Sequence, residues 1–268
     1  MLIDWIDAAE AMSKAPATFY SGARKIIQRT SITFEDLDHD LHMSDAGYTK
    51  SKMSMLKRLY LHEPSRDVAL QLWEGRRAKH KYGSVSFHTY NHFIKNDPDK
   101  KSKRASVMGP CLQSVCLTLS DKGAVEVDVF YRTTEVFKKF PADLVFLRDV
   151  LLADFNLEGF SSMVCHFANL TVHPMYYVTT IPHHKNPIKR LDHLKKVDPY
   201  FYDWVVKWTA RYLCDEYHRG IAKFAQAMRV CQDARARIPE DVLKELRPYL
   251  VKNHPGYRND YNEDGDEE

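Results

Sequence analysis

The chain has 268 residues, of which 44% are hydrophobic and 28% are charged. Lys and Arg (39) nearly balance Asp and Glu (36), so the formal net charge is only +3. This balance excludes a protein whose whole surface binds a polyanion, and we expect no direct binding of nucleic acid. No apolar run approaches the roughly 20 residues of a membrane helix, so we expect no membrane partner.

Five cysteines occur, and no two of them form a CxxC pair. With an odd number of cysteines and no visible secretory signal, we expect free thiols in a reducing, cytoplasmic setting. The acidic segment 256–268 is typical of a mobile tail. We therefore expect one domain over residues 1–255, followed by that tail.

The predicted elements change in kind along the chain. The pattern indicates a helix over 66–78, a turn and basic loop over 96–104, and strands over 112–119 and 124–132. A helix over 141–155, a β-rich stretch over 161–181 and helices over 198–230 and 239–250 follow. The sum is a mixed α/β (α+β) protein with a strand-rich middle and a helical C-terminal third.

Two groups near the central strands can carry chemistry. Cys111 follows Gly-Pro at the start of the first strand. A thiolate held near cations is a good nucleophile. The alternative is a buried, unreactive cysteine. Arg132 and Thr133 end the second strand. An arginine beside a hydroxyl group can hold a phosphate by hydrogen bonds. The alternative is that these polar groups are hydrated at the end of the strand.

His88 and His92 lack further ligands at matching spacing, so we expect no metal site.

The order of these features resembles the thymidylate synthase family. That family has an NDPD turn, paired arginines, Pro-Cys, and then an Arg-hydroxyl block before Val-Phe and a proline; here the corresponding stretches are "NDPDKKSKR", "PC" and "YRTTEVFKKFPAD". The match covers roughly residues 80–180. It implies a thymidylate synthase-like mixed sheet flanked by helices, which dimerises through the sheet.

The resemblance implies a role for each matching residue. Cys111 falls on the nucleophile that attacks C6 of a pyrimidine nucleotide, and Tyr82 falls on a tyrosine that assists proton removal from C5. Glu63 is the nearest candidate for the catalytic glutamate. The implied substrate-binding residues are Arg132, Thr133, Lys103, Arg104 and His173, of which Lys103 and Arg104 would reach the phosphate of the neighbouring subunit. Glu135 and Trp73 would bind the folate.

Asp143 stands where the family has a uracil-reading asparagine. Uracil offers an N3–H donor and an O4 acceptor, whereas cytosine offers an amino donor and an N3 acceptor. A carboxyl group suits cytosine, and a mismatched buried polar pair costs about 1–3 kcal/mol. The same change marks the deoxycytidylate (dCMP) hydroxymethylase branch of the family. The alternative is that Asp143 is simply an acid at the start of a helix.

The resemblance therefore implies a dCMP hydroxymethylase that uses 5,10-methylenetetrahydrofolate as co-substrate, in a homodimer, as in bacteriophages that modify their DNA precursors. The setting would be the cytoplasm of an infected host. Two alternatives remain open. One is a dCMP methyltransferase or thymidylate synthase of the same fold, and the other is an inactive homologue that binds a nucleotide.

Overall fold

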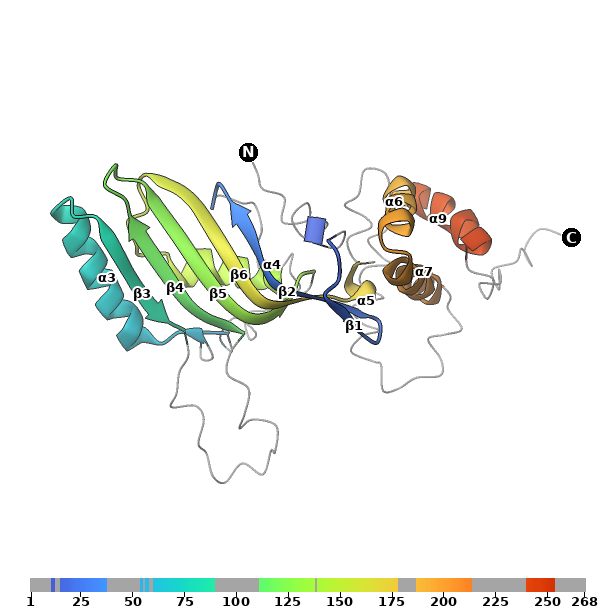
Figure 1. Ribbon diagram of the computed structural model, residues 1–268, viewed down its shortest axis with the longest axis horizontal. Coiled ribbons are helices and arrows are strands. Elements are labelled where there is room, and N and C mark those ends of the chain that lie inside the picture. The colour runs from blue at the N-terminus through green and yellow to red at the C-terminus, as the bar shows by residue number, and fades with distance from the viewer. Residues whose placement is uncertain are drawn as a thin grey trace, which may run out of the picture. The chain divides into compact units, whose positions relative to one another are not determined.

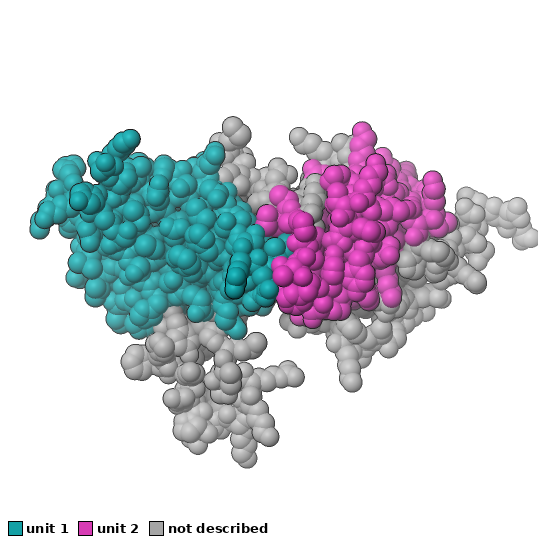
Figure 2. Space-filling view, in the orientation of Figure 1, with its two compact units in different colours: residues 1–9, 27–171 teal, residues 10–26, 172–268 magenta. Residues whose placement is uncertain are grey.

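The computed structural model describes residues 11–12, 15–37, 54, 56–57, 60–89, 111–137, 139–177, 187–213 and 240–253. The chain divides into two compact units, one of residues 1–9 and 27–171 and the other of residues 10–26 and 172–268 (Figure 2). The second unit combines segments that are distant in the sequence. The predicted tail lies outside the described residues.

A six-stranded sheet has the order β1-β2-β6-β5-β4-β3 (Figure 1). Its strands are β1 Phe19–Ser21, β2 Arg24–Phe34, β3 Gly83–His88, β4 Leu112–Leu119, β5 Val125–Glu135 and β6 Phe160–Val172. Strands β3, β4 and β5 pair antiparallel, whereas β5 and β6 are parallel, so the sheet is mixed. A mixed sheet with helices was predicted, and the α+β class is confirmed at this level.

The central strands show why the sequence folds in this way. Val127 and Val129 of β5 are buried, whereas Asp128 between them is half-buried. In β4, Leu117 is buried and its neighbour Cys116 is half-buried. This alternation of period two buries one face of the sheet, and it confirms both predicted strands.

A helical crossover joins the parallel strands β5 and β6, as parallel pairing requires. It begins as helix α4 (Phe140–Phe146) and continues as the π-helix η2 (Leu147–Leu151), in which the Leu152 N–H donates to the Leu147 carbonyl at 2.9 Å. Figure 1 shows α4 behind the sheet. Every residue of α4 is buried, because the helix is apolar on all sides apart from Asp143.

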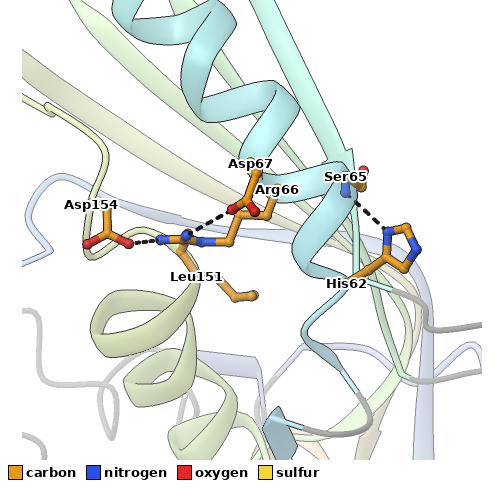
Figure 3. Close-up of polar contacts among 6 residues, drawn as sticks. All are labelled: His62, Ser65, Arg66, Asp67, Leu151 and Asp154. Carbon is orange, nitrogen blue, oxygen red and sulfur yellow. Dashed lines mark hydrogen bonds and ion pairs between the residues drawn. The ribbon is translucent and has the colours of Figure 1, made fainter.

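Helix α3 (Glu63–Ala78) is tied to the end of this crossover. Its N-cap is His62, whose Nδ1 accepts from the Ser65 N–H at 3.3 Å. One turn later, the Arg66 Nε donates to the Leu151 carbonyl at 3.0 Å, and its guanidinium forms an ion pair with Asp154 (Figure 3). The arginine thereby satisfies a carbonyl at the C-terminal end of η2 that has no partner within the helix.

The second unit contains helices α5 (Pro174–Tyr177), α6 (Pro187–Val197), α7 (Pro199–Leu213) and α9 (Glu240–Asn253). Asp198 caps α7 by accepting from the Phe201 N–H at 3.0 Å. Its carboxylate also accepts from Lys25 Nζ and from the Tyr20 hydroxyl, each at 2.6 Å. This buried network ties the N-terminal hairpin to the helical C-terminal part of the same unit.

Some elements differ from the predictions. Strands β2 and β3 were not predicted, because β2 mixes charged and apolar residues and β3 is short and rich in serine. The stretch predicted to be β-rich turns helical at Pro174. Across the parts of the chain that the structure describes, every helix is too short or too polar to cross a bilayer.

Candidate functional site

Cys111 lies immediately before β4 and is partly exposed. Its carbonyl oxygen accepts from the Arg132 N–H at 2.7 Å. This bond continues the pairing of β4 with β5, in which Leu112 faces Tyr131. The sheet itself therefore holds the thiol-bearing residue beside the arginine that was predicted to anchor a phosphate.

Tyr60 lies against Cys111 from the segment that precedes α3. Its hydroxyl is hydrogen-bonded to both the backbone and the thiol of Cys111. The ring lies 6.0 Å from that of Phe146, so α4 supports it from the side. Burial, followed by the negative charge of Asp143, raises the pKa of Tyr60 well above its ordinary value. Tyr60 therefore keeps its proton and can donate a hydrogen bond to a thiolate.

Asp143 projects from the first turn of α4 and is 6% exposed. The Thr134 hydroxyl, on β5, donates to its Oδ2 at 3.2 Å. Burial raises the pKa of Asp143 from 3.8 to about 7, although the Thr134 bond and Lys139 oppose the rise. Near neutral pH this carboxyl group exists in both protonation states, so it can donate or accept a hydrogen bond.

Tyr131 completes the buried side of the cluster. Its ring stacks on Phe167 at 5.1 Å and meets the edge of Phe140 at 5.9 Å. Its hydroxyl is buried, and within the described part of the chain it has no hydrogen-bond partner. Burial raises the pKa of Tyr131 well above its usual value, and further contributions come from the charges of Cys165, Asp143, Tyr60 and Cys111. The hydroxyl therefore lies within the field of the same polar cluster.

We call Cys111, Tyr60, Asp143 and Tyr131 the thiol cluster. It combines a thiol, a carboxyl group that titrates near neutrality and two hydroxyl groups, in a mostly buried setting. Perturbed ionisable groups beside a nucleophile are typical of sites that bind or transform a small molecule. The cluster can add a thiolate to an electrophilic carbon and hold a polar ring edge beside it.

The structure brings together several of the predicted residues. Cys111, Arg132 and Asp143 all belong to the cluster or adjoin it, and Thr133 follows Arg132 in β5 and is half-buried. Asp143 also occupies the first turn of α4. The two interpretations of Asp143, a base-reading group and a helix-start acid, are therefore compatible in position.

The structure does not bring Tyr82 to Cys111. The next residue, Gly83, pairs with Leu119 at the far end of β4. Seven residue steps at about 3.4 Å put the two ends of β4 roughly 24 Å apart, and Tyr82 lies beside the end that is remote from Cys111. Its side chain is 73% exposed. The Tyr-Gly dipeptide was misleading because it begins an edge strand that runs antiparallel to β4, and the tyrosine beside the thiol is Tyr60.

Glu63 and the two predicted folate residues have other positions. Glu63 is exposed in the first turn of α3, three residues after Tyr60, so their Cα atoms are at most about 11 Å apart. Trp73 is fully buried, and its indole N–H donates to the Asn156 carbonyl at 2.9 Å. The Glu135 carboxylate is buried and accepts from the Phe137 N–H at 3.1 Å. Trp73 and Glu135 are thus buried and hydrogen-bonded to backbone groups of their own unit, and neither fits a contact with a pterin ring.

Of the other three predicted residues, one belongs to the second unit and two lie outside the described residues. His173 belongs to the second unit, where its ring lies 6.0 Å from that of Trp208. Lys103 and Arg104, with the NDPD turn, lie outside the described residues. Among the residues whose placement is described, no three or more His, Cys, Asp or Glu side chains are grouped to hold a metal ion.

Two members of the cluster were missed from the sequence. Tyr131 lies on the same face of its strand as Val125, Val127 and Val129, and a buried tyrosine needs a partner for its hydroxyl, so a signal was present in the sequence. Tyr60 carries no such signal, because nothing in "RLYLHEP" indicates a contact with a residue fifty positions later.

No protein-family model matches the chain, and neither does any curated protein.

Proposed function

We propose that the chain is a pyrimidine nucleotide C5 one-carbon transferase that acts on dCMP, of the dCMP hydroxymethylase type. The observation that carries this proposal is that the buried Asp143 carboxyl and the Cys111 thiol both act on the hydroxyl of Tyr60. A thiol in the same polar cluster as a carboxyl that is partly protonated at neutral pH suits cytosine. The carboxyl can accept from the amino group and donate to N3.

The proposed chemistry begins at Cys111. Its thiolate adds to C6 of the cytosine ring, the C5–C6 double bond opens, and C5 becomes nucleophilic. A proton from water adds at C5, the original C5 hydrogen leaves as a proton, and expulsion of the thiolate restores the ring. This exchange needs no one-carbon donor. Tyr60 would orient the thiolate by donating a hydrogen bond to it, and Arg132 with Thr133 would anchor the phosphate.

The one-carbon donor in this proposal is methylenetetrahydrofolate, which is implied by the resemblance alone. Bound at the site, it would supply an electrophilic methylene group to C5. Neither Glu135 nor Trp73 supports its binding, so we derive no step through it. The homodimer and the contact of Lys103 and Arg104 with a neighbouring phosphate remain part of the proposal.

A second candidate is a nucleotide-binding homologue without turnover. The placement of Tyr82 favours it, because the residue expected to remove the C5 proton lies far from the thiol. Both candidates bind the nucleotide, but only the enzyme exchanges the hydrogen at C5. One experiment therefore separates them.

The experiment measures release of tritium from dCMP and from dUMP, each labelled at C5. The wild type should exchange dCMP faster than dUMP, and Cys111→Ser should abolish exchange while leaving the fold intact. Asp143→Asn should reduce the dCMP-to-dUMP ratio by roughly 5- to 150-fold, which corresponds to about 1–3 kcal/mol. Glu74→Gln, on the exposed side of α3, serves as the control.

Each outcome decides between the candidates. Nucleotide binding without exchange by the wild type supports the inactive homologue. Faster exchange of dUMP contradicts the cytosine assignment. Exchange that survives Cys111→Ser, beyond trace contamination, removes Cys111 from the mechanism.

A further inference from the structure

The Tyr131 hydroxyl is an exception to a general rule. Buried polar side-chain atoms in native proteins nearly always have a hydrogen-bond partner, and each exception needs a physical reason. In the described part of the chain, this hydroxyl is buried and has no such partner. Because Tyr131 is 3% exposed, solvent does not serve it either.

The direction of the hydroxyl is fixed by the packing of the ring. Tyr131 lies in a β-strand, and its ring is held between Phe140 and Phe167. Turning the hydroxyl towards solvent would break both contacts. The groups whose charges act on it belong to the thiol cluster and to the buried Cys165 beside it. The hydroxyl is therefore held within reach of the charges of the thiol cluster.

The neighbouring polar groups are already engaged. The Thr134 hydroxyl donates to Asp143, and the Tyr60 hydroxyl is hydrogen-bonded to Cys111. The described residues thus leave the buried Tyr131 hydroxyl without a partner in the cluster that contains the Cys111 thiol. An unused donor of this kind is typical of a site whose partner arrives with a ligand.

We propose that Tyr131 is a ligand-contacting residue of this site, whose hydroxyl donates a hydrogen bond to an acceptor atom on the pyrimidine ring. The inference rests on the proposed function and adds a recognition group to those that the resemblance implies. Cytosine and uracil both carry a ring carbonyl acceptor at C2. Tyr131 therefore recognises the pyrimidine, while Asp143 discriminates between the two bases.

The test is the dissociation constant of dCMP, and of dUMP as a second probe, measured by calorimetry without a one-carbon donor. Tyr131→Phe keeps the ring and removes only the hydroxyl, so it should fold and should bind both nucleotides about 10-fold more weakly. Tyr82→Phe makes the same chemical change at an exposed tyrosine far from the thiol, and it should bind as the wild type does.

The outcomes separate this inference from the proposed function. If the wild type binds dCMP and Tyr131→Phe binds it equally well, the inference is wrong and the proposed function stands. If the wild type prefers dUMP and Tyr131→Phe weakens that binding, the inference stands and the cytosine assignment falls. If the wild type binds neither nucleotide, both are overturned.

Discussion

Asp198 and Asp143 are both buried carboxyl groups, 7% and 6% exposed, in different units of the molecule. Asp198 accepts from an ammonium group, a phenol and a backbone N–H. Among the described residues, Asp143 accepts only from Thr134, and the hydroxyl of Tyr131 near it has no partner. We interpret the saturated network of Asp198 as a structural element, and we propose that the incomplete network in the thiol cluster binds a ligand.

The largest effect should come from breaking the saturated network. Lys25→Met removes the buried cation and leaves Asp198 with an uncompensated charge, so we expect a loss of about 3–5 kcal/mol in the free energy of unfolding. Chemical denaturation measures it, with Lys196→Met, at an exposed position of α6, as the control. Adding Asp198→Asn should recover part of the loss. A loss below about 1 kcal/mol would mean that the pair is not a structural element.

The incomplete network should show itself through pH. The pKa of Asp143 is raised by burial from 3.8 to about 7 in the folded protein, so the folded state holds this proton where the unfolded state has released it. The contribution of this protonated carboxyl to the free energy of unfolding is therefore fully present below about pH 4, and it is lost as the pH rises through 7. At 1.36 kcal/mol for each pKa unit, the loss approaches about 4 kcal/mol.

Asp143→Asn should remove this dependence and make the protein more stable than the wild type at pH 8. The measurement compares the unfolding free energy at pH 4.5 and pH 8 for the wild type, Asp143→Asn and the exposed control Glu74→Gln. Other titrating groups cancel in the difference between variants. An equal pH dependence in all three proteins would contradict the assigned burial cost.

Two Tyr→Phe substitutions should have the smallest effects on the free energy of unfolding. One should lower it, and the other should leave it unchanged or raise it. Tyr20→Phe removes a hydrogen bond to the charged Asp198 carboxylate, and it should cost about 2 kcal/mol. Tyr131→Phe removes a hydroxyl without a described partner, and it should leave the ligand-free protein equally stable or up to about 1 kcal/mol more stable. Thermal and urea unfolding of both variants measures the contrast. Equal destabilisation by the two changes would show that Tyr131 is already satisfied in the free protein.

The fold was partly predictable because local patterns carry part of it. The alternation of valines in β5 and the apolar run of β4 predicted both strands, since each buries one face. The apolar stretch after Pro141 predicted a helix, but not that it becomes a π-helix at Leu147. The same residues are buried in either helical form, so the sequence pattern does not distinguish them.

The residues of the site could be predicted only where their neighbours in the sequence form a distinctive pattern. Cys111 after Gly-Pro and Arg132 before two threonines stood out, and strand pairing joins them. Tyr82 was misplaced because a dipeptide says nothing about which end of a strand it occupies. Tyr60 could not be found, since its contact with Cys111 depends on tertiary packing of the segment before α3.

The pairing of Lys25 with Asp198 sets an order of events during synthesis. The two residues are 173 positions apart, and at 5–20 residues per second the ribosome needs roughly 9–35 s to produce the aspartate after the lysine. Until then, the N-terminal hairpin has no carboxylate to receive its ammonium group. Residues 27–171 of the first unit are all synthesised within that interval. The unit that contains the N-terminal hairpin is thus the last to be completed.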